Sequence, residues 1–260
     1  MGGMRVTRDA GRRTGVLLWV LLVAGLPALL MAQAAPSDAE QSLLRLANQA
    51  RAEHGLPALR WDAALARAAR AHLDRMVGEP ELEHQYPGEA DLEARAAQAG
   101  ARFSTVSENL AARGQSPAAL QQKWMSTAVH RANLLNPDLD VVGIAVVEKD
   151  GLLCAVEDFG RSVPVQRNED IEKRVAQELQ AHGIAPAESN ADARQSCGMA
   201  KGAVGSPKLV VQWDGSDPTA LPDALLQQIA SGRFRSAGVG VCPGQQGGAF
   251  TTYHVAVLLY

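Results

Sequence analysis

Apolar residues between positions 37 and 163 follow helical spacing in some segments and strand spacing in others. Helical patterns cover residues 37–54, 62–76, 91–99 and 116–130, and strand patterns cover 103–111, 141–147 and 152–159. Asp150-Gly151 separates the last two runs, which is typical of a β-hairpin. This order of elements predicts an α+β domain, an antiparallel sheet covered by helices, that ends near Val163.

Residues that cap helix ends accompany these patterns. Ser37 and Glu40 have the spacing of a capping box, and Asp62 stands directly before the second helix. Ser116 precedes a proline at the first helical position of the fourth helix. We therefore expect these helices to begin at these residues.

The remaining chain, residues 164–260, predicts a smaller α/β lobe. Asn168 is a candidate cap for a helix that ends at Gly183, and a polar stretch follows. Further elements are expected as strands at 209–213, 237–242 and 251–259 and as a helix at 221–229. The lobe has the size of a small domain.

Three pairs of short segments hint at a degenerate half-repeat. Residues 54–57, 117–122 and 143–146 resemble, in turn, 182–186, 222–227 and 238–241. Shared composition of α/β segments is the alternative explanation.

Residues 1–34 are predicted to be a secretory signal peptide. Four arginines precede an apolar run from Val16 to Met31, and Ala32-Gln33-Ala34 supplies a cleavage site. The run is short for a membrane span, and no cysteine follows it closely enough for a lipoprotein anchor. An uncleaved anchor or an unstructured tail is the alternative. We expect a secreted protein, extracellular or periplasmic, without a stable membrane span after cleavage.

Composition argues against nucleic acid as a partner. Aromatic residues make up 4% of the chain and the formal net charge is −3. Loss of residues 1–34 removes four Arg and one Asp, which leaves a charge of −6. Neither stacking platforms nor phosphate neutralisation fits this composition.

Export makes a disulfide possible among the three cysteines. Cys197 and Cys242 both lie beside turn-forming residues in the smaller lobe, and we predict that they pair. Cys154 lies in an apolar strand pattern and is expected to be a buried free thiol. A Cys154–Cys197 bridge is the competing possibility.

Three polar clusters in the first domain could carry chemistry. They are centred on His84, on Glu108-Asn109 and on the stretch from Trp124 through His130 to Pro137. Each alone has an ordinary structural explanation, as a solvated loop residue, a strand-end cap or a helix-end cation. Trp124 is expected to be a buried anchor, and Asn133 to bond backbone in the turn before Pro137.

Together these clusters resemble the CAP family of cysteine-rich secretory, antigen 5 and pathogenesis-related proteins, in its cysteine-poor bacterial form. Glu108-Asn109-Leu110-Ala111 is similar to the family's Glu-Asn-[Leu/Ile]-Ala signature. The stretch from His130-Arg131-Ala132-Asn133 to Pro137 is similar to the family's bacterial helix signature. Phe159-Gly160 is similar to the end of the family's domain. The resemblance covers residues 43–160.

The resemblance implies an α-β-α sandwich with one cleft lined by His84, Glu108 and His130. Thr127 stands where the eukaryotic pattern has a second Glu, so the family's four-residue set is incomplete. Glu157 replaces the Gln of the bacterial strand motif.

Three classes of function follow for this cleft. Two imidazoles and a carboxylate are a plausible ligand set for a divalent metal ion such as zinc. Because no complete catalytic set can be written from the sequence, we expect a secreted, non-enzymatic binding module for a metal, a lipid or a peptide. A hydrolase, metal-assisted or using Ser126 beside His130, is the first alternative. A purely structural cell-envelope protein is the second. We expect polar atoms of His84, Glu108 and His130 within about 8 Å of one another, near enough for one ion to bridge.

Overall fold

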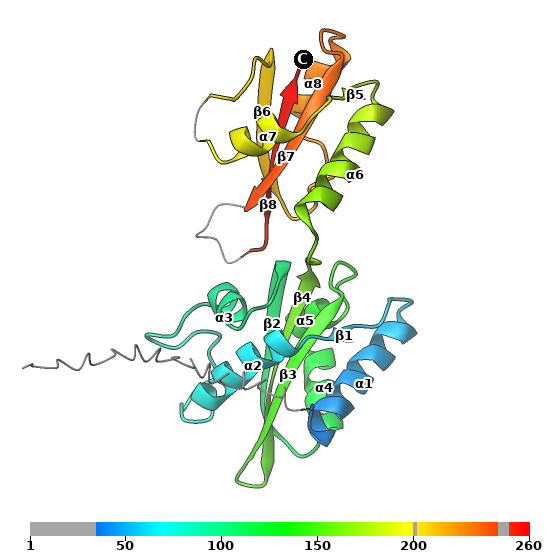
Figure 1. Ribbon diagram of the computed structural model, residues 1–260. Coiled ribbons are helices and arrows are strands. Elements are labelled where there is room, and N and C mark those ends of the chain that lie inside the picture. Colours follow the sequence, from blue (N-terminus) through cyan, green and yellow to red (C-terminus); the bar gives the residue numbers. More distant parts are fainter. Residues whose placement is uncertain (1–34, 200–201, 244–249) are drawn as a thin grey trace, which may run out of the picture. The chain divides into compact units, whose positions relative to one another are not determined.

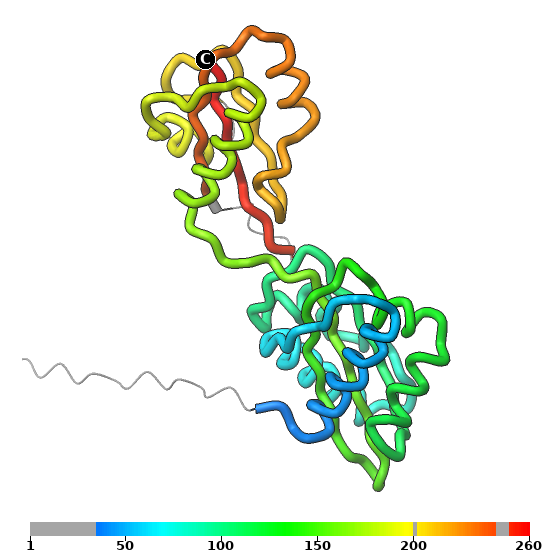
Figure 2. Tube along the Cα trace, turned by 90° about the vertical axis from the view of Figure 1, so that its right-hand side faces the viewer, coloured from blue at the N-terminus to red at the C-terminus, as the bar shows by residue number. Residues whose placement is uncertain are grey.

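The computed structural model describes residues 35–199, 202–243 and 250–260, so the predicted signal peptide lies outside the described residues. Two four-stranded sheets follow one another along the chain (Figure 1). The first group of elements is α1 (Asp38–Glu53), β1 (Arg60–Trp61), α2 (Ala63–Met76), α3 (Leu92–Gln98), β2 (Phe103–Gly114), α4 (Pro117–Ser126), α5 (Ala128–Leu134), β3 (Val141–Lys149) and β4 (Leu152–Ser162). The second group is α6 (Asn168–Ala181), β5 (Ala185–Pro186), α7 (Ala191–Cys197), β6 (Leu209–Gly215), α8 (Asp223–Ala230), β7 (Ser236–Pro243) and β8 (Tyr253–Leu259). Each sheet is built from its own continuous stretch of chain, as the trace in Figure 2 shows.

The first sheet has the strand order β1-β3-β4-β2, with β1 parallel to β3 and the other pairs antiparallel. Helices α1 and α4 pack over one face, where Leu43, Trp124 and Phe159 share a buried cluster. Helix α2 packs over the other face, where Leu73 lies against Val156. The predicted α+β class and the α-β-α sandwich are therefore confirmed.

The predicted caps account for three of the helix starts, and at the start of α4 the Ser116 side chain accepts from the Ala119 N–H. The Ser37 side chain accepts from the Glu40 N–H, and Glu40 in turn accepts from the Ser37 N–H, so the capping box is complete. Asp62 accepts from the N–H groups of Ala64 and Leu65 at the start of α2. The hairpin turn is also as expected, because Asp150 and Gly151 both have positive φ, at 54° and 74°.

Other expectations for the first domain and the lobe were wrong in their details. The helix predicted at 116–130 is two helices, because Thr127 is extended and ends α4 before α5 begins. Asn168 does not cap α6, since Arg167 holds the cap position and the Asn168 amide donates to the Val241 carbonyl. The polar stretch after Pro186 contains α7, whose buried side holds only Ala193, Ser196 and Cys197. Such a short apolar stripe gives no periodic signal.

Gly143 lets α2 lie directly on the first sheet. A Cβ at this position would be 2.0 Å from the backbone nitrogen of Ala66. A similarly close approach occurs in the second sheet at Gly240, where a Cβ would be 2.3 Å from the carbonyl carbon of Ala193 in α7. In both sheets a strand glycine therefore sets the distance to the covering helix.

The second sheet repeats the topology of the first. Its order is β5-β7-β8-β6, with β5 parallel to β7 and the remaining pairs antiparallel. Ile171 of α6 and Leu225 of α8 share one buried cluster, and Ala193 of α7 belongs to another with Leu258. The predicted Cys197–Cys242 disulfide is present, with Cα atoms 6.0 Å apart, and Cys154 is a buried free thiol.

Candidate functional site

A buried carboxylate, Glu108 on β2, joins two basic side chains of the first domain. Glu108 Oε1 lies 2.7 Å from Nδ1 of His84, and Glu108 Oε2 lies 2.6 Å from the NH2 nitrogen of Arg95. The Glu108 side chain is 1% exposed and that of Arg95 5%, whereas the imidazole of His84 is 63% exposed. Since a carboxylate only accepts hydrogen bonds, Nδ1 of His84 carries a proton.

The loop that carries His84 is held by further side chains. Arg95 of α3 donates to the carbonyl oxygens of His84 and Ala90. His72 of α2, which is fully buried, lies 2.7 Å from Glu89 Oε1, and Glu89 Oε2 accepts the N–H of Tyr86. The position of His84 is therefore fixed from two helices and a strand rather than by the loop alone.

His130 lies on α5, which is tied to the same strand. The amide of Asn109 donates to the His130 carbonyl at 3.1 Å, and the amide of Asn133 donates to the Glu108 carbonyl at 3.2 Å. Asn133 thus links α5 to β2, and the expectation that it bonds the turn before Pro137 was wrong. The helix passes beside the strand, so the strand carbonyl is nearer than the turn.

The two histidines have opposite pKa shifts. The hydrogen bond that His84 donates to Glu108 raises the pKa of His84 above its ordinary value. Burial, and then the positive charge of His84, lowers the pKa of His130. There is therefore a range of pH in which the imidazole of His130 is neutral while that of His84 still carries protons on both ring nitrogens. Whether His130 shares one ligand site with Glu108 stays a prediction.

Two further acids lie under this site, fully buried on β4. Asp158 pairs with Glu108 across the strands, and Glu157 pairs with Asn109. Neither carboxylate has a hydrogen-bond partner in the described part of the chain. Burial, together with the negative charge of Glu108, raises the pKa of Asp158 well above its ordinary value. Burial raises the pKa of Glu157 to about 8.

The residues proposed for hydrolysis do not meet. Ser126 is exposed and its hydroxyl donates to the Lys123 carbonyl at 2.8 Å. Because the helix breaks at Thr127, Ser126 and His130 do not share a helix face, and that expectation was wrong. Thr127 is exposed and its hydroxyl also donates to Lys123. No serine–histidine hydrogen bond occurs among the residues that the structure describes.

A compact three-ligand metal site is also absent here, as far as the described residues show. Both oxygens of Glu108 are already used by His84 and Arg95. In the described ranges, the one group of His, Cys, Asp or Glu ligand atoms within 4.8 Å of one another is Cys197, Cys242 and His254. A metal ion bound by His84 would therefore use its imidazole and leave Glu108 as the support of that ring.

Sequence reasoning missed Arg95 and Asp158. Arg95 stands in an ordinary helical pattern, and nothing local marks it as buried. Asp158 did carry a signal, because Glu157 and Asp158 are adjacent charges in the middle of a strand that is apolar on both faces. Charges at such positions are rare unless they are paired or functional.

A shallow groove lies elsewhere on the first domain, between α1 and the start of α4. Its volume is about 440 Å³, and its lining combines polar side chains with Leu46 and Pro117. None of the residues of the His84 site lines it.

Comparison with known proteins assigns the first domain. Residues 44–159 match the sequence profile of the Cysteine-rich secretory protein family, CAP. This segment is a CAP domain. The CAP domain carries His84, Glu108 and His130, the three residues that the resemblance placed in its cleft.

The chain is similar to proteins of two Bacillus species. Over 113 residues the chain is 29% identical to YkwD, an uncharacterized protein of Bacillus subtilis, and the match covers 44% of each protein. It is 30% identical over 113 residues to YlbC, an uncharacterized membrane protein of the same bacterium, covering 44% of this chain and 33% of that protein. An extracellular SCP-domain protein of Bacillus anthracis is 30% identical with a TM-score of 0.45, covering 47% of this chain and 40% of that one. The chain spans less than half the length of each of these relatives.

No helix among the described residues has both the length and the apolar character needed to cross a membrane.

Proposed function

We propose that the CAP domain is a non-enzymatic binding module, and that His84 and His130 bind a divalent metal ion such as zinc. The observation that carries this proposal is an exposed imidazole held by a buried carboxylate. A histidine that ligates a metal commonly donates its other ring N–H to a carboxylate, which fixes the tautomer and the ring orientation. His84 has this arrangement, with Nδ1 on Glu108 and with no hydrogen bond of Nε2 among the described residues.

The energetics also favour a functional site over a structural one. A buried ion pair costs desolvation and adds little net stability. Here Arg95 and Glu108 are buried together while the group they support, His84, stays exposed. A purely structural cluster would bury His84 as well.

We also propose that residues 164–260 are a degenerate copy of the CAP domain that lacks this site. In the first sheet Gly143, Asp158 and Glu108 form one cross-strand row. The two sheets can be aligned by their parallel strand pairs, β1–β3 in the first and β5–β7 in the second. In this alignment the matching row of the second sheet is Gly238, Leu258 and Val210. The same topology thus occurs with an apolar row, which supports the view that the acids serve binding rather than folding.

The proposed location is outside the cytoplasm, either extracellular or periplasmic. The signal-like pattern of residues 1–34 supports export, and so does a disulfide in the described structure. The Bacillus anthracis relative is itself an extracellular protein.

Calorimetric titration of the oxidised protein with zinc tests the metal site. We expect binding at pH 7.5 that is abolished by His84→Ala and weakened about 10- to 100-fold by Glu108→Gln, which keeps the shape but removes the charge. His182→Ala is the matched control, because His182 is an exposed helix-end histidine of the other lobe. Binding should weaken as the pH falls through the pKa of His84, since the metal competes with the proton.

If zinc binding were unchanged in His84→Ala, the metal proposal would be overturned. Heat signals with fatty acids or peptides that depend on His84, in the absence of metal, would favour the other ligand classes instead.

A further inference from the structure

A second row of chemically active side chains crosses the sheet of residues 164–260. Cys242 on β7 pairs directly with His254 on β8, and His254 pairs directly with Asp214 on β6. Residues paired across neighbouring strands point to the same face of a sheet. The three side chains therefore line one face, the face that α7 covers.

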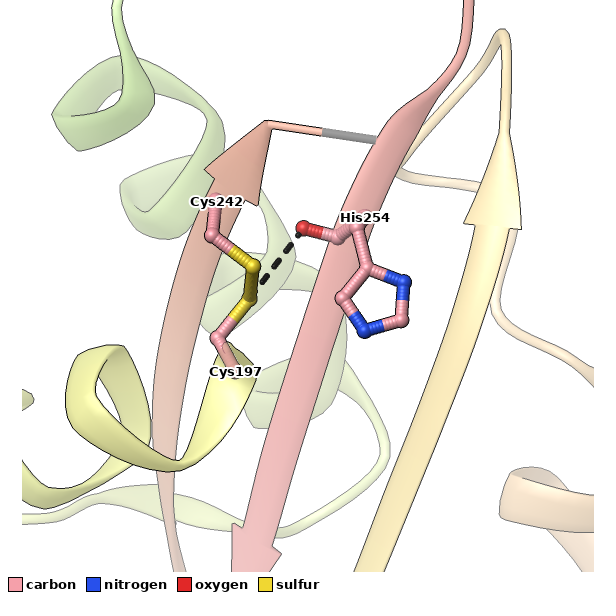
Figure 3. A group of neighbouring side chains, drawn as sticks. All are labelled: Cys197, Cys242 and His254. Atoms are coloured by element: carbon pink, nitrogen blue, oxygen red, sulfur yellow. Dashed lines mark hydrogen bonds between the residues drawn. A yellow bond between two sulfur atoms is a disulfide. The ribbon is translucent and has the colours of Figure 1, made fainter. Parts of the chain in front are cut away.

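Helix α7 brings a fourth group to this row. Cys197, at the end of α7, forms the disulfide with Cys242 and lies with its Sγ 3.5 Å from the carbonyl oxygen of His254 (Figure 3). One ligand atom from each of Cys197, Cys242 and His254 lies within 4.8 Å of the others. The imidazole of His254 lies beside the two sulfur atoms in Figure 3 and is 16% exposed.

Asp214 orients the imidazole. Its Oδ1 lies 3.1 Å from Nδ1 of His254, so Nδ1 carries the proton and Nε2 remains as the coordinating nitrogen. As at His84, a carboxylate binds one ring nitrogen of a histidine and leaves the other nitrogen to coordinate a metal. A disulfide by itself requires neither His254 nor Asp214.

We infer that Cys197, Cys242 and His254 form a zinc site when the disulfide is reduced. Two thiolates and one neutral imidazole are soft and borderline ligands that suit Zn²⁺, and three protein ligands leave the fourth tetrahedral position to water. The disulfide and the metal site are alternative states of the same residues. The lobe thus has two ways of linking α7 to β7, one for oxidising and one for reducing conditions.

The step that interconverts these states balances with a dithiol as reductant. The dithiol gives two electrons and two protons to the S–S bond and is itself oxidised to a disulfide, which leaves Cys197 and Cys242 as thiols. Zinc then displaces both thiol protons and binds the thiolates with His254, so that the site is neutral overall.

Cobalt titration of the full chain tests the inference, with Cys154→Ala as the background so that the free thiol contributes nothing. After reduction by a dithiol and its removal under nitrogen, Co²⁺ should produce a thiolate-to-cobalt charge-transfer absorption, and zinc should displace it. The oxidised protein should show no such band, because a disulfide is not a thiolate. The His84 site cannot produce this band either, so the two proposals fail or succeed independently.

Substitutions distinguish this site from adventitious thiol binding. We expect His254→Ala to weaken cobalt binding at least about 10-fold and Asp214→Asn to weaken it about 10- to 100-fold, while His182→Ala leaves it unchanged. Circular dichroism of the reduced full chain follows folding, and zinc should raise its melting temperature also in a His84→Ala background. The inference would be overturned if the reduced protein showed no charge-transfer band. It would also be overturned if His254→Ala bound cobalt as tightly as the wild type. Both results would count even if reduction partly unfolded the lobe.

Discussion

Glu157 shows how a single buried acid sets the pH response of a domain. The side chain is fully buried, without a hydrogen-bond partner in the described chain, and its pKa is raised from 4.5 to about 8. Between these two values the unfolded state has released the proton while the folded state still holds it. The contribution of Glu157 to stability therefore falls as the pH rises from about 4.5 towards 8, by at most about 1.4 kcal/mol per pH unit.

Glu157→Gln should remove the contribution of Glu157 to this dependence, since Gln keeps the shape and cannot ionise, whereas the buried Asp158 still contributes. We expect the variant to exceed the wild type in stability at pH 8 by about 2 kcal/mol or more and to match it more closely at pH 5. Urea unfolding at a series of pH values measures this. Glu148→Gln, at an exposed position of the same hairpin, is the control and should leave the profile unchanged.

Trp124 is the largest fully buried side chain, as expected from its place in the fourth predicted helix. Its indole N–H donates to the Leu110 carbonyl at 2.9 Å. Trp124→Ala should cost about 3–5 kcal/mol through lost burial and an unfilled cavity. Trp124→Phe, which loses the hydrogen bond but fills most of the space, should cost clearly less in the same unfolding measurement. Equal melting temperatures for wild type and Trp124→Ala would contradict this account.

At the scale of elements, the contact of α2 with β3 depends on Gly143. A methyl group there would fall inside the backbone of α2, so the helix must move away from the sheet. We expect Gly143→Ala to cost about 3 kcal/mol, at the upper end for overpacking, because backbone rather than a flexible side chain must shift.

Gly198→Ala is the matched control, since nothing lies within 4 Å of a Cβ at that position. Its unfolding midpoint should stay near that of the wild type. An equally small loss of stability for Gly143→Ala would contradict this account, because it would mean that α2 can move away from β3 at little cost.

The break between α4 and α5 is an element-scale feature with consequences for function. A continuous helix would have placed Ser126 and His130 one turn apart. The extended Thr127 instead turns α5 towards β2, where Asn133 reaches Glu108 and Asn109. His130 is therefore positioned by strand contacts and not by the helix that precedes it.

At the scale of the whole molecule, two sheets with one topology provide an internal comparison. The first contains the Glu108–Asp158 row and the second its apolar counterpart, Val210–Leu258. Removing Glu108 alone by Glu108→Val leaves the buried Arg95, among the described residues, with only its longer ion pair to Glu89, at 3.8 Å, so we expect a loss of about 3–5 kcal/mol.

Replacing the cluster together, as Arg95→Met, Glu108→Val and Asp158→Leu, should restore most of that loss or exceed wild-type stability, while zinc binding disappears. Denaturant unfolding and zinc calorimetry of the single and triple variants measure the two effects separately. A triple variant less stable than Glu108→Val would mean that the charges hold the fold.

Local chemistry determined much of this protein in advance of any structure. The capping box at Ser37, the Asp150-Gly151 turn and the alternation of apolar residues depend on neighbours within a few positions, so they predicted α1, the β3–β4 hairpin and the α+β class. The order of the motifs likewise pointed to His84 and Glu108, which the structure joins by a hydrogen bond.

Tertiary structure alone decided the features that depend on distant residues. Arg95 became a partner of Glu108 because α3 lies over β2, and Asp158 became its neighbour through the strand register. The free energies involved, desolvation and cross-strand charge interaction, arise only once the sheet has formed. The same reason applies to the second lobe, where three strands and α7 are needed before Asp214, His254 and the two cysteines become one site.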